Sequence, residues 1–560
     1  MDNSAIADNF DLLAKLMDIH GENSFKTKTY SIAAFNIEKL PMQLKDSPRE
    51  KLFSIKGIGD SVGKKVIEML DTGKLEVLNE YIQKTPPGVI EMLNIKGIGP
   101  KKIHTIWKEM EIESLGELLY ACGENRLTLF KGFGEKTQAN VQAAIEFYFL
   151  NQGHFLYAQL EEIFPQVEGY LKKLFSTDKV RVTGNYRRQS TTIEELEFVI
   201  LESNENIKPK FQTAQPPELM EETANSLLFK LKNGLKLRLY TGGSNRAAEL
   251  FRTTGNAAFT EAFNKKYPGL KYNGDETEED EIIFTKAGIT YIPPCLRETA
   301  DIIDKAAKKM LPELIRTEDI RSIIHSHSNW SDGSNTLEEM AEECIKRGYE
   351  YLVISDHSQT AFYANGLKED RIKAQHKQID ELNKQLKPFK IFKSIESDIL
   401  NDGSLDYPVH ILKTFDLVIA SVHSNLKMTE EKAMARLIKA IENPYTRILG
   451  HMTGRLLLSR NGYPVDHKKI IDACAANKVV IEINAHPRRL DMDWKWIDYA
   501  LQKKVLLSID PDAHFREGFN DVKYGVLAAQ KGGLTKEWNL SSFGLKEFEE
   551  WVRKEKIIFH

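Results

Sequence analysis

The chain has 560 residues, too many for one hydrophobic core, so three to five domains are expected. Its 77 Lys and Arg against 81 Asp and Glu give a net charge of −4. This balance excludes a positive electrostatic potential over the whole protein, so any contact with nucleic acid must come from local basic patches. The first residues lack a basic and then apolar leader, and no apolar run reaches the length of about 18 residues that a membrane helix needs. We therefore expect a cytoplasmic protein without membrane spans, and four scattered cysteines indicate reduced thiols.

Residues 1–150 predict helices, and they contain an internal repeat. Residues 52–70, 92–110 and 127–145 each place an apolar-Lys-Gly-apolar-Gly turn between two helical patterns. The repeated positions are Lys56, Gly57 and Gly59, then Lys96, Gly97 and Gly99, then Lys131, Gly132 and Gly134. The glycines permit a tight turn, and the following helix begins with N–H groups that can bind a phosphate. The repeat resembles the helix-hairpin-helix motif, which implies DNA-backbone binding without reading of sequence.

The stretch K-T-K-T-Y-S-I-A-A-F (26–35), the first hairpin and the strands further on resemble the family X DNA polymerases. The resemblance implies a lyase-like domain followed by fingers, palm and thumb. Lys65 occupies the position of the Schiff-base lysine in members with 5′-deoxyribose-phosphate lyase activity, which makes it a lyase candidate. A solvated helix lysine is the alternative interpretation.

Residues 151–240 turn to short strand patterns, at the place of the family palm. The family motif is a Gly-Ser turn, an Asp-x-Asp strand and a third Asp on a neighbouring strand, which together hold two Mg²⁺ ions. In this sequence the matching positions carry Gly184, Asn185, Glu195, Glu197 and Lys236.

These departures from the motif predict a lost polymerase activity. The longer glutamates displace carboxylates whose placement is critical, and Lys236 puts a cation where the metals need an anion. The basic pair of the family motif is retained as Arg187 and Arg188. These arginines either bind a phosphate of the nucleotide or DNA, or are simply a pair of surface residues.

From residue 319 onward, apolar strand-like runs alternate with helical stretches, which predicts a parallel sheet or an α/β barrel. Seven of these runs end in His, Asp or Glu, beginning with I-H-S-H-S-N-W-S-D-G (324–333). The carboxyl ends of barrel strands form active sites, and imidazoles and carboxylates that converge there need a cation. Mixed His and carboxylate ligands favour Mn²⁺, Zn²⁺ or Fe²⁺ over Mg²⁺ alone.

These segments resemble the PHP (polymerase and histidinol phosphatase) domain, a trinuclear metallo-phosphoesterase. All nine of its ligand positions are matched, by His325, His327, Asp332, His357, Glu396, His423, His451, Asp512 and His514. The resemblance implies three divalent ions. The first is held by His325, His327, Glu396 and Asp512, the second by Glu396, His423 and His451, and the third by Asp332, His357 and His514.

Four further polar residues of this region are candidates for substrate binding or for supporting the metal ligands. Arg455 and Arg489 are candidates for binding substrate phosphate, because a guanidinium fork matches phosphate oxygens. Asp398 and Glu482 are expected to orient the metal ligands or to be structural.

The resemblance covers essentially the whole chain and implies a multidomain α+β and α/β fold. The expected parts are a lyase-like helix-hairpin-helix domain (1–80), a fingers-like helix-hairpin-helix domain (81–150), a polymerase-β-like palm (151–240), a thumb (241–318) and a distorted (β/α)7 PHP barrel (319–560).

The leading hypothesis is a monomeric DNA-repair enzyme that binds gapped or 3′-ended DNA and acts at the PHP site as a 3′→5′ exonuclease or 3′-end-processing phosphodiesterase. The alternatives are an active gap-filling polymerase with PHP proofreading, a small-molecule phosphatase of the histidinol-phosphatase type, and a DNA-bridging module without catalysis.

Overall fold

The structure is a computed structural model that describes residues 1–55, 58–123, 126–150, 153–176, 179–211, 216–231, 234–243, 245–270, 279–361, 364–458 and 461–554. The chain divides into two compact units, Met1–Gln152 and Gly153–His560. Among the described residues, no helix is both long and apolar enough to cross a membrane.

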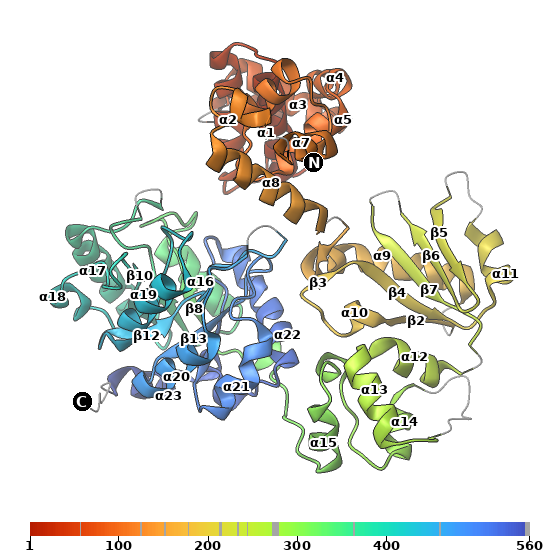
Figure 1. Cartoon of the computed structure of the whole chain (residues 1–560). Helices are drawn as coiled ribbons and strands as arrows, with labels where there is room; N and C mark the ends of the chain where they lie inside the picture. Colours follow the sequence, from red (N-terminus) through yellow and green to blue (C-terminus); the bar gives the residue numbers. More distant parts are fainter. Residues whose placement is uncertain are drawn as a thin grey trace. The chain divides into compact units, whose positions relative to one another are not determined.

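The first unit is helical (Figure 1). Its helices are α1 (Asn3–Ile19), α2 (Ser24–Glu38), α3 (Asp60–Thr72), α4 (Glu76–Lys84), α5 (Pro87–Glu91), α6 (Pro100–His104), α7 (Leu115–Gly123) and α8 (Glu135–Leu150). One apolar core extends from Ile6 to Ile145, so the two helix-hairpin-helix regions share a single core.

The three repeated turns share one backbone hydrogen bond. The N–H of Ile58, Ile98 and Phe133 each donates to the carbonyl three residues earlier, at 2.9, 3.3 and 3.1 Å. Gly59, Gly99 and Gly134 directly precede α3, α6 and α8. Gly97 and Gly132 have φ of +90° and +92°, the left-handed region that favours glycine. Lys56 and Gly57 lie outside the described residues.

The second unit begins with a five-stranded sheet in the order β2-β4-β7-β6-β5. Its strands are β2 (Val180–Thr183), β4 (Glu195–Ile200), β5 (Glu218–Thr223), β6 (Ser226–Lys230) and β7 (Lys236–Tyr240). Two short strands, β1 (Phe155–Leu156) and β3 (Thr192–Ile193), pair with each other in antiparallel orientation. The helices of this region are α9 (Tyr157–Phe175), α10 (Gly184–Arg187) and α11 (Asn204–Ile207). Parallel pairing of β4 with β7 places Glu195 beside Lys236 and Glu197 beside Arg238.

A small helical region follows, with an aromatic core around Phe251, Phe259, Phe263 and Phe284. Its helices are α12 (Arg246–Thr254), α13 (Ala257–Lys266), α14 (Glu281–Lys286) and α15 (Asp301–Ala307). The five-stranded sheet, which lies where the palm is expected, has its own core, from Leu160 to Leu239.

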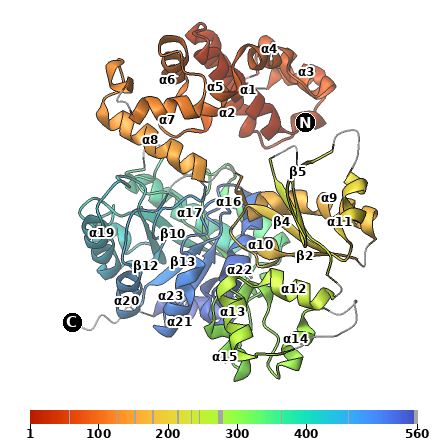
Figure 2. The same ribbon diagram turned by 45° about the vertical axis from the view of Figure 1, so that its right-hand side comes forward.

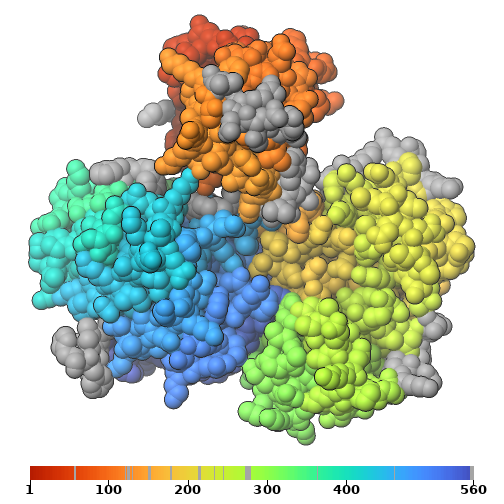
Figure 3. Space-filling view, in the orientation of Figure 1, coloured from red at the N-terminus to blue at the C-terminus, as the bar shows by residue number. Residues whose placement is uncertain are grey.

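The C-terminal region is a nearly closed barrel of seven parallel strands, in the order β14-β13-β12-β11-β10-β9-β8. The strands are β8 (Ser322–Ser326), β9 (Tyr351–Ile354), β10 (Lys390–Asp398), β11 (Leu417–Ser421), β12 (Thr446–Leu449), β13 (Val480–Asn484) and β14 (Leu507–Asp510). The helices are α16 (Leu337–Lys346), α17 (Glu369–Gln385), α18 (Val409–Leu412), α19 (Glu430–Glu442), α20 (His467–Asn477), α21 (Ile497–Gln502), α22 (Val522–Lys531) and α23 (Leu545–Arg553). Figure 2 shows several of these helices around the strands, and the region forms one continuous mass in Figure 3.

Two apolar layers hold the barrel. The larger one lies between strands and outer helices, and the smaller one joins Ile324, Val353 and Ile419 of the strands to Phe548 of α23. The first and last strands meet where β8 ends, because the N–H of His327 donates to the carbonyl of Ala513 at 2.8 Å. The first and last strands are therefore joined at the same edge that carries the predicted ligands.

Candidate metal centre

All nine side chains assigned by the PHP resemblance lie together at the carboxyl ends of the barrel strands. His325 and Glu396 belong to β8 and β10, and the other seven follow the ends of β8, β9, β11, β12 and β14. His325 and Asp512 have φ of +59° and +52°, a conformation rare for residues other than glycine. Backbone strain of this kind is found where the surrounding structure fixes a functional side chain.

Glu396 is the centre of the inner part of the cluster. Its Oε1 lies 3.0 Å from Nε2 of both His423 and His451 and 3.3 Å from Nε2 of His325. Its Oε2 lies 3.0 Å from Nδ1 of His357. Nε2 of His327 is 3.7 Å from the same Oε2. The side chain of Glu396 has no exposed surface, so a single buried carboxylate faces five imidazoles.

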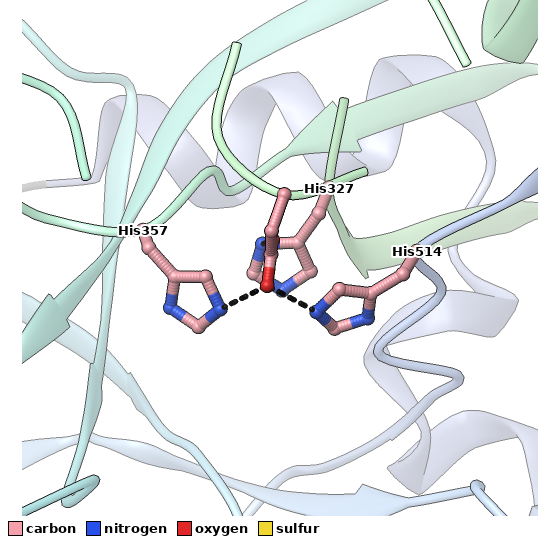
Figure 4. Close-up of side chains that lie close together, drawn as sticks. His327, His357 and His514 are labelled. Atoms are coloured by element: carbon pink, nitrogen blue, oxygen red, sulfur yellow. Dashed lines mark ion pairs between the residues drawn. The ribbon is translucent and has the colours of Figure 1, made fainter. Parts of the chain in front are cut away.

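The outer part of the cluster is formed by His327, Asp332, His357 and His514. Figure 4 shows the three imidazoles converging from separate segments of the barrel. Oδ2 of Asp332 is 3.4 Å from Nε2 of His514 and 3.6 Å from Nε2 of His357. Asp332 and His514 have 27% and 36% of their side-chain surface exposed, whereas His325 and His327 have none, so this is the side that solvent reaches.

The ligand atoms form three groups whose members all lie within 4.8 Å of one another. One group is His325, His327, Glu396 and Asp512, which is the set expected for the first ion. Another is His327, Asp332, His357 and His514, which contains the set expected for the third ion. The remaining group is His357, Glu396 and His423, whereas the expected second set has His451 in place of His357.

Electrostatics in the cluster favour ionised acids. Burial opposes ionisation of Glu396, but the imidazoles of His423 and His325 hold its pKa well below the usual range. Burial, with His514 and His357 nearby, lowers the pKa of His327 to about 3, so this ring is neutral at pH 7 and offers a lone pair. Glu396 and Asp398 overcome the effect of burial and raise the pKa of His423 to about 10.

The residues present fit divalent cations. Nε2 of His325, Nδ1 of His327, Nδ1 of His451 and Oε2 of Glu396 are buried atoms without a hydrogen-bond partner in the part of the chain that the structure describes. Buried polar atoms are normally paired, and nitrogen and oxygen atoms of this kind are ligands for Zn²⁺, Mn²⁺ and Fe²⁺.

Two carboxylates contact candidate ligand imidazoles on the side away from the cluster. Oε2 of Glu482 lies 2.5 Å from Nδ1 of His325, and Oδ1 of Asp398 lies 2.6 Å from Nδ1 of His423. Each contact leaves the opposite nitrogen, Nε2, facing the cluster. This arrangement fixes the ring orientation and makes the imidazole a stronger ligand.

Asp356 organises the loop that carries Asp332, a role that we did not infer from the sequence. Its buried carboxylate accepts hydrogen bonds from the backbone and hydroxyl of Ser328, at 2.8 and 2.7 Å, and of Ser331, at 3.2 and 2.6 Å. Gln375 of α17 donates to it at 2.6 Å. The serines of the H-S-H-S-N-W-S-D-G stretch were a signal that an acceptor must lie nearby.

The two arginines predicted to bind phosphate differ in their surroundings. Arg455 donates to the carbonyls of Arg489 (3.0 Å from Nε) and Leu490, and is ion-paired with Asp493 at 2.5 Å. Its guanidinium is therefore engaged inside the protein. Arg489 is partly exposed, with Nε 3.9 Å from Oδ2 of Asp512 at the edge of the cluster.

The residues at the positions expected to form the polymerase site are held by ion pairs and hydrogen bonds within the protein. Arg238 grips Glu195 with Nε and Nη2, at 2.6 and 3.2 Å, and Lys236 is paired with Glu194 at 2.8 Å. Glu197 accepts hydrogen bonds from the N–H of Asn185 (2.8 Å) and from the hydroxyl of Tyr240 (3.0 Å). Burial raises the pKa of Glu197.

The retained arginines of the palm are not a surface pair. Arg187 binds the buried Asp280 through two nitrogens, at 2.8 and 2.9 Å. Arg188 is paired with Glu298 at 3.3 Å and donates to Oδ1 of Asn185 at 2.5 Å. Lys531 of α22 also contacts Glu298, at 2.5 Å.

In the first unit, Lys96 and Lys131 are exposed at their turns, and Lys65 lies half-buried in α3. Their assignment to DNA backbone and to lyase chemistry stays a prediction.

Three family models match the chain. A helix-hairpin-helix domain matches residues 1–75, a SAM-like helix-hairpin-helix tandem matches residues 89–146, and the PHP domain matches residues 324–486. Together with the barrel and its cluster, these matches define the class: a DNA-binding protein with a metal-dependent phosphoesterase domain.

The relatives extend this conclusion to the whole chain. The DNA polymerase/3′-5′ exonuclease PolX of Bacillus subtilis is 31% identical over 97% of this chain and 98% of its own length. Probable phosphatases of Caldanaerobacter subterraneus (29% identical, 29% of this chain, 60% of theirs) and of a Thermoanaerobacter species (25% identical, 41% of this chain, 94% of theirs) match the chain in part. The chain belongs to the PolX family, the family X DNA polymerases that carry a C-terminal PHP domain.

Proposed function

We propose that this enzyme removes nucleotides or blocking groups from the 3′ ends of gapped or broken DNA at the PHP site, with three divalent ions of Mn²⁺, Zn²⁺ or Fe²⁺, and that its palm no longer transfers nucleotides. The observation that carries the proposal is the cluster of nine side chains formed by Glu396 and the eight residues near it. Bound ions would lower the pKa of water and neutralise charge on the phosphate.

The exposed side of the cluster indicates where the phosphodiester binds. Asp332 and His514 are its accessible members, and Arg489 stands beside it with a guanidinium that can bind phosphate oxygens. We assign Arg455 a positioning role instead, because it holds the backbone carbonyls of Arg489 and Leu490.

The palm contacts support a loss of nucleotide transfer. The glutamates at the two aspartate positions are occupied by Arg238, by the backbone of Asn185 and by Tyr240, so metal binding there must first break these contacts. Arg188 is likewise occupied by Glu298, whose carboxylate repels a triphosphate.

The proposal also includes domain borders at residues 80, 150, 240 and 318. It further includes a monomeric state and a cytoplasmic location. Lys65 remains the lyase candidate, and the helix-hairpin-helix turns are proposed to hold the DNA backbone.

The test is incubation of labelled gapped DNA with Mn²⁺, with and without deoxynucleotides, for the wild type and three variants. Glu396→Gln keeps the shape of the central side chain but removes its charge, and we expect at least a hundredfold slower 3′ digestion. Glu431→Gln, an exposed position on α19, is the matched control. Digestion by Glu396→Gln at the wild-type rate would show that the nuclease site is elsewhere.

The double variant Glu195→Gln/Glu197→Gln tests the palm in the same assay. We expect no deoxynucleotide-dependent extension by the wild type. Robust extension that this double variant abolishes would contradict the loss of polymerase activity. Faster hydrolysis of a simple phosphate monoester such as p-nitrophenyl phosphate than of DNA would favour the phosphatase alternative, which the probable phosphatases among the relatives support.

A further inference from the structure

Asp406 is a buried acid, outside the set of nine candidate ligands, that contacts the segment after one of them. It lies between β10 and α18 with 5% of its surface exposed, and its N–H donates to Oγ of Ser397 at 3.1 Å. Its carbonyl accepts a hydrogen bond from Nε2 of Gln359 at 2.8 Å, and Oδ2 of its side chain accepts one from the N–H of Thr360 at 2.8 Å. Asp406 therefore holds the segment that directly follows His357.

The hydroxyl of Thr360 extends this contact toward a second ligand. Its Oγ1 lies 2.9 Å from Oδ2 of Asp406 and 2.7 Å from Oδ2 of Asp398. The other oxygen of Asp398, Oδ1, lies 2.6 Å from Nδ1 of His423. A continuous chain of polar contacts thus leads from Asp406 to the ring of His423, whose Nε2 is 3.0 Å from Oε1 of Glu396.

The number of hydrogens gives this chain a direction. A hydroxyl carries one hydrogen, so Thr360 can donate to only one of the two carboxyl groups. The other contact is a hydrogen bond only if that carboxyl group carries a proton of its own. Burial raises the pKa of Asp406, and the nearby charge of Asp398 adds to this. A protonated Asp406 donates to Oγ1 of Thr360, and the hydroxyl then donates to Asp398.

We propose that Asp406 is a positioning residue of the metal centre. Through Thr360 it holds two ligands in place, His357 by its backbone segment and His423 by its ring. With Glu396, these two histidines form one of the groups whose atoms lie close enough to hold an ion. The proposal rests on the metal centre of the proposed function, but not on DNA as the substrate or on the state of the palm.

The test is a titration of the full chain with Mn²⁺ after removal of metal by a chelator, with free Mn²⁺ measured by electron paramagnetic resonance. Loss of a partner behind a metal-bound histidine typically weakens metal binding by about 10- to 100-fold, and we expect this for at least one ion in Asp406→Ala and in Thr360→Val. Asp402→Asn, at an exposed acid of the same loop, is the matched control and should bind like the wild type.

Asp406→Asn tests the direction of the chain. The amide is neutral, as a protonated acid is, and its oxygen can still accept the N–H of Thr360 while the hydroxyl donates to Asp398. We therefore expect this variant to keep nearly the wild-type affinity for Mn²⁺. A loss as large as that of Asp406→Ala would overturn the proposed direction and with it the proposal.

The double variant Asp406→Ala/Thr360→Val tests whether the two residues act through each other. Residues in one hydrogen-bond network are not additive, so the double variant should bind Mn²⁺ about as well as the weaker single variant. Additive losses, or wild-type affinity in either single variant, would overturn this proposal alone. A wild type that binds no Mn²⁺ would overturn the metal centre as well. Thermal unfolding of the metal-free proteins should show that the variants fold, and Thr360→Val decides the matter if Asp406→Ala does not.

Discussion

Glu482 illustrates how a residue outside the ligand set can control the cluster. It holds Nδ1 of His325 at 2.5 Å and also accepts a hydrogen bond from the N–H of His451 at 3.0 Å. One carboxylate therefore fixes two ligands, one through its ring and one through its backbone.

We predict that Glu482→Gln weakens metal retention by 10- to 100-fold, the range seen when partners of metal-bound histidines are removed. The amide would donate to Nδ1 of His325 and move the ring proton to Nε2, which faces Glu396 at 3.3 Å. Metal content after dialysis, measured beside Glu431→Gln, checks this. Equal metal content in the two variants would show that Glu482 is not needed for ligand orientation.

His376 of α17 gives a pH dependence away from the metal cluster. Burial, with Lys393 nearby, lowers the pKa of this imidazole to about 4, against the opposing effect of Asp380. The unfolded chain binds this proton near pH 6.5 and the folded chain only near pH 4, so stability is complete above pH 6.5 and is lost as the pH falls toward 4.

We therefore predict that His376→Gln loses less thermal stability than the wild type between pH 7 and pH 5. All other titrating groups are common to both proteins, so the difference between their melting temperatures isolates this residue. A difference that stays constant with pH would contradict the assigned pKa.

At the scale of elements, the turn from β2 into α10 depends on one glycine. Gly184 has φ of +63°, and a Cβ there would lie 1.7 Å from Oε2 of Glu197. The Glu197 carboxylate thus packs directly on the backbone of this turn, where it accepts the hydrogen bond from the N–H of Asn185.

Gly184→Ala is predicted to destabilise the protein by about 1–3 kcal/mol or more, because it adds both backbone strain and a clash. Gly169→Ala, in the middle of α9 with nothing near its Cβ, should be neutral or stabilising by up to about 1 kcal/mol. Thermal unfolding of both variants tests the contrast. If Gly184→Ala unfolds at the wild-type temperature, the glycine requirement is wrong.

At the same scale, the spacing of motifs was sufficient to predict which segments turn and which strand ends carry ligands. The Lys-Gly-apolar-Gly repeats and the strand-ending histidines are local patterns, and the structure has turns and groups of side chains that could hold a metal ion at those places. The partners of Arg187, Arg188 and Arg455 could not be predicted, because Asp280, Glu298 and Asp493 come from distant segments and only the fold brings them near. The contacts of Asp356 with Ser328 and Ser331 likewise depend on the fold.

For the molecule as a whole, the charge balance has a consequence for DNA binding. A net charge of −4 means that affinity must come from a few local contacts, and Lys131 at the third hairpin is one that we propose. Each phosphate contact releases counterions and contributes to the dependence of affinity on salt.

Lys131→Gln is predicted to weaken binding to duplex DNA about equally for all sequences and to reduce the slope of log affinity against log salt by about 1. Lys84→Gln, whose lysine is paired with Glu80 on α4, is the control. Binding titrations at several salt concentrations give both slopes, and identical slopes for the two variants would remove Lys131 from the DNA contact.

The closure of the barrel determines when the enzyme can become active during synthesis. His327 and Asp512 are 185 residues apart in the sequence, yet they share one ligand group, and the hydrogen bond from His327 to Ala513 joins the first strand to the last. A nascent chain that still has β14 inside the ribosome lacks Asp512 and His514 and so cannot complete the centre. Under the proposed function, the helix-hairpin-helix unit emerges first and would hold DNA before the barrel can cut a phosphodiester, which would restrict hydrolytic activity to chains made to nearly their full length.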